Sequence, residues 1–197
     1  NEERLKQILP LVEKTQSYLI LDESFVDFLG DSFSYRKLCL CHRQVIIVSS
    51  LTKFYAVPGL RIGCSFSTEE IAKKCQEQLI PWHVNGLVQT YMKSALADDA
   101  YIQRTREYCK TERNRMITDL SAIDSIKVYP GSVNFFLCKL TRKFKSAYEL
   151  QQALWPYKII LRQCGNYAGL DESYFRIAVK IKEENLRLVN ALRKVLE

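Results

Sequence analysis

Hydrophobic and polar residues follow two periods along this chain, one typical of helices and one typical of strands. Near the start, apolar residues recur at helical spacing among charged ones and predict an amphipathic helix ending near Thr15: Leu5, Ile8, Leu9 and Val12. Short runs rich in β-branched residues predict strands at 18–21, 45–48, 61–66, 126–129, 135–140, 159–162 and 174–179. Further helices are predicted at 67–79, after the interruption at 81–85 as far as about 97, and at 99–123, 146–154 and 183–196. Strands that alternate with helices predict an α/β fold with a mostly parallel sheet.

Composition adds limits to this picture. The 197 residues are 47% hydrophobic and 26% charged, which is typical of a globular protein with a real core. No apolar run reaches the roughly 18 residues that a membrane span needs, so no membrane partner is expected. The net charge is +7, but the basic residues are spread out and form no nucleic-acid-binding module, so an anionic small molecule is the expected partner.

The cysteines suggest a reducing compartment. There are seven, an odd number, and they are scattered along the chain, which favours free thiols and a cytoplasmic location. Cys39, Cys41 and His42 form one half of a possible zinc pattern without a second half, so no metal site is predicted.

The chemically most informative stretch is 50–63, directly after the predicted strand 45–48. Lys53 could form a Schiff base with an aldehyde, while Ser50, Thr52 and Arg61 could bind a phosphate dianion. The alternative is a solvated loop lysine and an arginine in a surface ion pair.

This stretch resembles the lysine motif of the fold-type-I aminotransferase superfamily, which uses pyridoxal 5'-phosphate (PLP). The shared pattern is a small residue, an apolar residue, Ser or Thr, Lys, a spacer, Gly, an apolar residue, Arg, an apolar residue and Gly. The resemblance implies that Lys53 carries the cofactor as an aldimine and that Ser50 and Arg61 hold its phosphate. We expect Thr52 to contact the cofactor as well.

Asp22 directly follows the strand predicted at 18–21. A buried carboxylate there could pair with a protonated pyridine nitrogen and keep the cofactor ring electron-withdrawing. The alternative is a helix cap or turn residue. The resemblance favours the cofactor role, although Phe25 departs from the tyrosine that many aminotransferases place three residues after this aspartate.

Two arginines lie at predicted strand positions near the end of the chain, and a planar guanidinium suits a carboxylate or phosphate. The alternative is a structural ion pair with Asp171 or Glu172. Arg176 resembles the superfamily's arginine for the substrate carboxylate, and we expect Arg162 to bind substrate as well. The pattern at 162–171 with 174–179 resembles the threonine-phosphate decarboxylases of cobalamin biosynthesis, which are related to histidinol-phosphate aminotransferases.

By this resemblance, the chain should decarboxylate L-threonine O-3-phosphate to (R)-1-aminopropan-2-ol O-phosphate. One alternative is a histidinol-phosphate-type aminotransferase, and another is a non-catalytic fragment or binding module. Residues 1–98 would belong to the PLP-binding large domain, and 99–197 to a linking helix and a small α+β domain. The chain starts without Met and resembles the C-terminal part of a longer homodimeric enzyme, so we expect it to be inactive alone.

Overall fold

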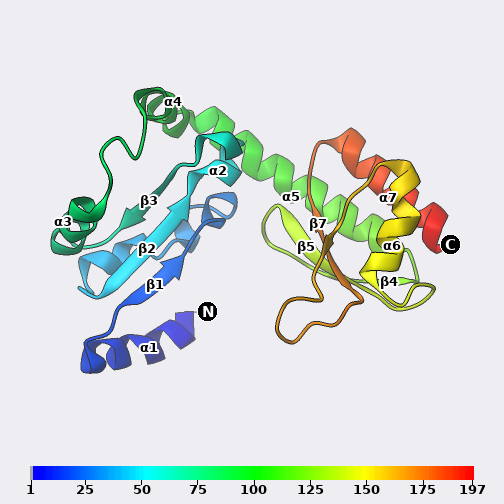
Figure 1. The fold of residues 1–197 in the computed structure, drawn as a ribbon, viewed down its shortest axis with the longest axis horizontal. Coiled ribbons are helices and arrows are strands. Elements are labelled where there is room, and N and C mark those ends of the chain that lie inside the picture. The colour runs from blue at the N-terminus through cyan, green and yellow to red at the C-terminus, as the bar shows by residue number, and fades with distance from the viewer. Residues whose placement is uncertain (1) are drawn as a thin grey trace. The chain divides into compact units, whose positions relative to one another are not determined.

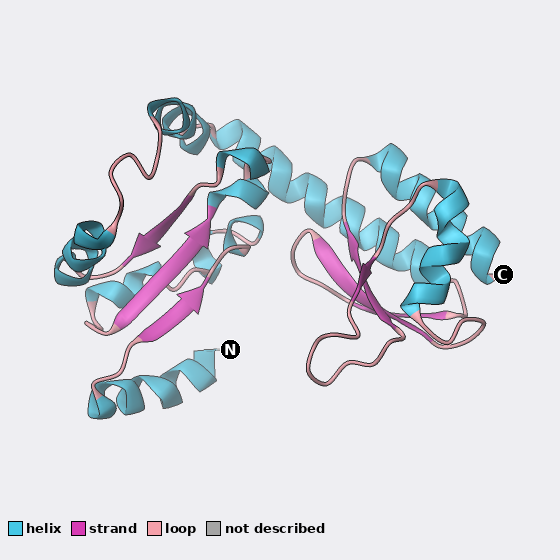
Figure 2. Cartoon of the chain, in the orientation of Figure 1, coloured by secondary structure: helices cyan, strands magenta, loops and turns pink. Residues whose placement is uncertain are grey.

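The computed structural model describes residues 2–197, and its contacts divide the chain into two compact units (Figures 1 and 2). The first unit runs to Thr105, and the second unit is Arg106–Glu197. The helix α5 (Asp99–Ser121) contains the division. The predicted domain boundary near residue 98 stays a prediction.

The first unit contains a three-stranded sheet. Strands β1 (Leu19–Asp22) and β2 (Val45–Ser50) pair in parallel, and β3 (Gly63–Phe66) pairs antiparallel with β2. Every second residue of β2 is buried, because side chains alternate between the two faces of a strand. The helix α1 (Glu2–Thr15) contributes Leu5 and Leu9 to the cluster that also holds Val45 and Ile47. Shorter helices follow: α2 (Leu51–Phe54), α3 (Glu69–Gln78) and α4 (Gly86–Leu96).

The second unit contains an antiparallel sheet in the order β4-β5-β7-β6. Its strands are β4 (Ile126–Tyr129), β5 (Phe135–Leu140), β6 (Arg162–Gln163) and β7 (Tyr174–Ala178), and its helices after α5 are α6 (Ala147–Leu154) and α7 (Lys182–Leu196). One face of this sheet packs on the helices around a continuous core that includes Met116, Leu150 and Phe175.

The α/β class is confirmed, and three local predictions are corrected. Within the first unit, one of the two strand pairings is antiparallel rather than parallel. The strand predicted at 61–66 begins only at Gly63, because Arg61 has the left-handed backbone φ 48°, ψ 56°. The strand predicted at 159–162 is limited to Arg162–Gln163. Among residues 2–197, no helix combines the length and apolar character needed to cross a membrane.

Candidate functional site

The carboxyl ends of β1 and β2 bring most of the predicted cofactor residues together. The two strands are parallel, and Asp22 pairs with Val48, so Asp22 and Ser50 emerge at the same sheet edge. A cavity of about 250 Å³ lies there, lined by Ser24, Val48, Ser49, Ser50, Thr52, Arg61, Ile62 and Gly63. The predicted Ser50, Thr52 and Arg61 therefore share one cavity. The sequence analysis missed Ser24 and Ser49. The only clue in the sequence was that Ser24 follows the first strand and Ser49 lies at the end of the second.

The donors of this cavity suit a phosphate group. Ser50 Oγ and Thr52 Oγ1 are 2.9 Å apart and share a hydrogen bond. The Arg61 side chain is exposed, and its Nη1 donates a 3.4 Å hydrogen bond to the carbonyl of Pro58. Two hydroxyls and a guanidinium at one concave edge form the kind of donor set that binds a phosphate dianion. The residues present therefore fit the phosphate of PLP.

The missing side chain of Gly63 allows β2 and β3 to approach each other closely beside the cavity. A Cβ atom at position 63 would lie 2.7 Å from the carbonyl oxygen of Ser49, closer than real Cβ contacts. Strands β2 and β3 approach each other closely at the register pair Ser50 and Gly63. The second glycine of the lysine motif thus has a steric explanation.

Lys53 lies in the short helix α2. Its side chain is exposed, and its Nζ lies 4.9 Å from the centre of the Phe25 ring. Phe25 stacks on Phe28, and Phe28 meets the buried Phe54 edge-on at 5.0 Å between ring centres. Phe25 offers no hydroxyl, but its ring face favours an ammonium group at this position.

Asp22 is exposed in the described chain, which corrects the expectation of a buried carboxylate. One of its oxygens accepts a 2.8 Å hydrogen bond from the N–H of Ser24, so the turn contact that the sequence left open is present. The hydrogen bonds from Ser24, and to a lesser extent the Lys53 ammonium, lower the pKa of Asp22. Asp22 is therefore anionic at neutral pH, as a partner of a protonated pyridine nitrogen must be.

A buried ionic cluster behind the cavity was not predicted. Glu23, which is 7% exposed, accepts hydrogen bonds from Ser34 Oγ at 2.7 Å and from the N–H of Tyr35 at 2.6 Å. Arg36 Nη2 lies 3.1 Å from Asp27 Oδ1 and 3.5 Å from Ser49 Oγ. Arg36 thus fixes Ser49, which lines the cavity.

The two arginines predicted to bind substrate lie on neighbouring strands of the second unit. Arg162 and Arg176 are register partners in the β6–β7 pair. Arg162 is exposed and lies 5.8 Å from the ring centre of Tyr167, while the half-buried Arg176 lies 4.8 Å from that of Phe135.

Neither arginine forms an ion pair with a carboxylate of residues 2–197, so the alternative of a structural ion pair is not supported. Asp171 instead contacts Lys139, with 3.2 Å between carboxylate oxygen and Nζ.

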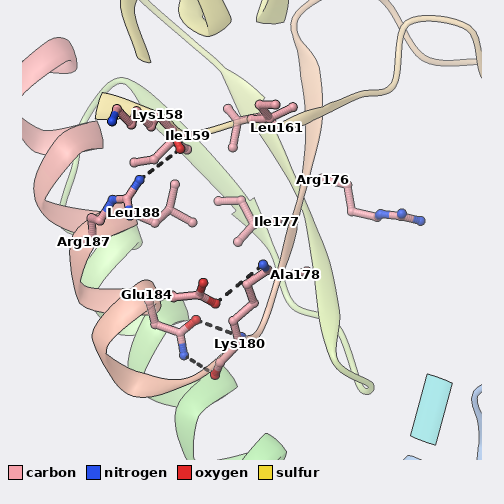
Figure 3. Close-up of a pocket in the computed structure, with 12 residues that line it drawn as sticks. Lys158, Ile159, Leu161, Arg176, Ile177, Ala178, Lys180, Glu184, Arg187 and Leu188 are labelled. Carbon is pink, nitrogen blue, oxygen red and sulfur yellow. Dashed lines mark hydrogen bonds and ion pairs between the residues drawn. The ribbon is translucent and has the colours of Figure 1, made fainter. Parts of the chain in front are cut away.

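A separate cavity of about 220 Å³ lies between β7 and α7, with Ile177 and Leu188 among its lining residues (Figure 3). Arg187 donates hydrogen bonds of 2.7 and 2.9 Å to the carbonyls of Tyr157 and Lys158, and Lys180 pairs with Glu184 at 3.5 Å. The side chain of Arg176 points away from this cavity (Figure 3). Two of its basic side chains already have protein partners, so this cavity is a poor candidate for the anionic substrate.

The cysteine–histidine pattern of the N-terminal half serves other contacts. Cys39 Sγ lies 3.2 Å from the carbonyl oxygen of Phe66, and His42 Nδ1 lies 2.9 Å from Glu13 Oε1. No group of three potential metal ligands occurs within the part of the chain that the structure describes.

Comparison with known proteins places this geometry in context. Residues 1–192 match the family model described as aminotransferase class I and II. The chain is 36% identical over 179 residues to the threonine-phosphate decarboxylase of Salmonella typhimurium, covering 90% of this chain and 48% of that protein. It is 31% identical to a histidinol-phosphate aminotransferase of Caldanaerobacter subterraneus, covering 97% of this chain and 52% of that protein.

The crystal structure of the histidinol-phosphate aminotransferase of Clostridium acetobutylicum has a TM-score of 0.93 and 32% identity, and the match covers 99% of this chain and 59% of that one. The chain thus spans about half the length of the curated relatives it matches.

Proposed function

Because the chain belongs to the aminotransferase class I and II family, we propose that it carries the PLP site of an enzyme that decarboxylates L-threonine O-3-phosphate. The product would be (R)-1-aminopropan-2-ol O-phosphate. The observation that carries the proposal is the cavity that Ser50, Thr52 and Arg61 of the lysine motif line together. Lys53 follows Thr52 directly in the chain and is not itself among the lining residues. The 36% identity to a threonine-phosphate decarboxylase supports the choice of substrate.

The first unit supplies the cofactor contacts. Ser50, Thr52 and Arg61 would hold the cofactor phosphate, and Lys53 would bind its aldehyde carbon. Anionic Asp22 would hold the proton on the pyridine nitrogen. When bound, the cofactor ring accepts the electrons of the bond that breaks at the substrate's α-carbon.

Lys53 and Phe25 suit a reaction that returns a proton to the α-carbon. Once its amine is free, Lys53 needs to be an ammonium group to donate that proton. The Phe25 ring lies 4.9 Å from Nζ, so a cation–π contact would hold the end of the Lys53 side chain in one position.

Arg162 and Arg176 would orient the two anionic groups of the substrate. They lie side by side as register partners and lack carboxylate partners within residues 2–197. One would take the carboxylate and the other the phosphate, so that the bond to be broken is held in a fixed direction.

The test uses the complete polypeptide that carries this chain, loaded with PLP. We expect a visible absorbance band that is lost in Lys53→Ala, and release of CO₂ from threonine phosphate in equal amount to the aminopropanol phosphate formed. A band that persists in Lys53→Ala would overturn the cofactor site.

The second candidate is a histidinol-phosphate aminotransferase, which the 31% identity to such an enzyme favours. In that case, the band would change with histidinol phosphate and recover with an oxo acid, and threonine phosphate would release no CO₂. If PLP binds with neither activity, the chain acts as a binding module.

We further propose that the enzyme works in the cytoplasm as a homodimer. The free thiols of all seven cysteines fit a reducing compartment. Light scattering on the complete polypeptide would test the dimer, and a monomer with full activity would contradict it.

A further inference from the structure

One face of the second unit's sheet carries a row of cations. Side chains alternate along β5, so Phe136, Cys138 and Leu140 enter the core while Lys139 lies on the opposite face. Lys127 of β4 is the register partner of Lys139, which in turn is the register partner of Tyr174 on β7. The face thus presents two lysines directly opposite each other.

Two tyrosines join these lysines. The rings of Tyr129 and Tyr174 stack with 6.0 Å between their centres. Lys127 Nζ lies 5.1 Å from the ring centre of Tyr129, and Lys139 Nζ lies 4.8 Å from that of Tyr174. A continuous row of stacked rings and ammonium groups therefore runs from β4 across β5 to β7.

Of the two lysines, only one has a carboxylate partner among residues 2–197. Like charges that face each other across a strand pair destabilise a sheet. Lys139 is compensated by Asp171, at 3.2 Å between Nζ and Oδ2. The exposed Lys127 forms no ion pair with any carboxylate in residues 2–197, although it faces Lys139 directly. An external anion would remove this repulsion.

We propose that Lys127, Lys139, Tyr129 and Tyr174 form an anion site for a phosphate group on the open face of this sheet. Lys127 supplies the uncompensated charge, and the phenol of Tyr129 provides a neighbouring hydroxyl. The site is distinct from the cavity of Ser50, Thr52 and Arg61. It lies on the same sheet face as Arg176, because Leu137 is the register partner of both Tyr129 and Arg176, but it uses other side chains. It does not depend on the proposed reaction.

The geometry favours a small anion over single-stranded nucleic acid. Nucleic-acid platforms need free aromatic faces on which bases stack. Here, the rings of Tyr129 and Tyr174 stack on each other, and each has a lysine ammonium over its face.

The pKa of Tyr129 agrees with a cationic environment. The hydrogen bond from Tyr174, followed by the charge of Lys127, lowers the pKa of the Tyr129 phenol. An anion bound beside Lys127 would offset that charge, so Tyr129 is a natural reporter of binding.

The experiment is a titration with inorganic phosphate at low ionic strength, followed by NMR of tyrosine labelled with ¹³C at Cζ. The complete polypeptide carries Arg61→Asn throughout, which removes the arginine of the other phosphate cavity. We expect a saturable shift of the Tyr129 signal, about tenfold weaker binding in Lys127→Gln, and a smaller loss in Tyr129→Phe, measured by calorimetry.

The control is Lys145→Gln, which removes the same charge from an exposed loop residue of the same unit. Equal weakening by Lys127→Gln and Lys145→Gln, or a Tyr129 signal that does not respond to phosphate, would overturn the site. A parallel titration with threonine phosphate, in a protein that also carries Arg162→Gln and Arg176→Gln, separates two supporting outcomes. Binding that requires Lys127 and is tighter than that of inorganic phosphate indicates the phosphate of an amino-acid phosphate, and equal binding that requires Lys127 indicates free phosphate.

Discussion

At the residue scale, the lysine motif combines chemistry with backbone constraints. Arg61 lines the cavity and has a left-handed backbone, a region that non-glycine residues rarely adopt. Ser50 and Thr52 share a hydrogen bond beside it. The spacing of the motif therefore serves two purposes. It places hydrogen-bond donors at the cavity, and it allows the backbone to turn into β3.

Replacing Arg61 should separate these two roles. Asparagine tolerates the left-handed backbone, so Arg61→Asn should preserve the fold but remove the charged donor. We expect PLP to bind about tenfold or more weakly, since one charge-assisted hydrogen bond contributes about 1.5–3 kcal/mol. Absorbance titration with PLP measures this. Arg43→Asn, at another exposed arginine, should leave the affinity unchanged, and equal losses would contradict the role of Arg61.

Gly63 gives a steric prediction. The Cβ of Gly63→Ala would meet the Ser49 carbonyl oxygen at 2.7 Å, so the variant should lose about 1–3 kcal/mol of unfolding free energy. Gly59→Ala is the matched control, because nothing lies within 4 Å of its Cβ. Urea denaturation measures both variants, and equal stability of the two would show that the strands relax without cost.

At the element scale, a buried polar cluster fastens α5 to the start of α7. Asn185, which is 1% exposed, donates 2.9 Å and 2.8 Å hydrogen bonds to Glu112 Oε2 and to the carbonyl of Lys180. Arg115 Nη2 donates a 2.7 Å hydrogen bond to the same Glu112 oxygen. The cluster holds the connection between β7, which carries Arg176, and α7.

The cluster should make stability depend on pH. The hydrogen bond from Arg115 lowers the pKa of Glu112. A lowered folded pKa means that the stabilisation is complete above the unfolded glutamate value of about 4.3, and is lost as the pH falls through the folded value. Glu112→Gln should therefore cost about 1–3 kcal/mol of unfolding free energy at pH 7 and less at pH 3.

Urea denaturation at both pH values tests this prediction. Glu107→Gln, at an exposed position of the same helix, is the control and should change little at either pH. A cost of Glu112→Gln that is the same at pH 7 and pH 3 would contradict the ionic role of Glu112.

At the scale of the whole molecule, the chain has two compact units, each with its own hydrophobic cluster. Leu150 is fully buried in the cluster of the second unit. Leu150→Ala should cost about 2–5 kcal/mol and speed hydrogen exchange mainly within Arg106–Glu197. Leu186→Ala, at a 40% exposed position, is the matched control. Equal acceleration in both units would show that they unfold as one.

The chain shows which parts of a site can be predicted without a structure. The grouping of Ser50, Thr52 and Arg61 around one cavity was predictable, because these residues lie within one contiguous stretch. The exposure of Asp22 was not, because burial depends on residues far away in the sequence. The true extent of β6 was not predictable either, because Ile159 and Leu161 pack on the core without pairing in the sheet.

Most helices and strands, the α/β class and the lysine motif can be read from the amino-acid sequence, because local periodicity and spacing encode them. The contacts between strands become visible only in the folded chain. Folding brings Ser24 and Ser49 into the cavity of Ser50, Thr52 and Arg61, leaves Arg162 and Arg176 without carboxylate partners among residues 2–197, and sets Lys127 opposite Lys139. The physical reason is register: which side chains face each other depends on how separate strands align, and no single stretch of sequence specifies that alignment.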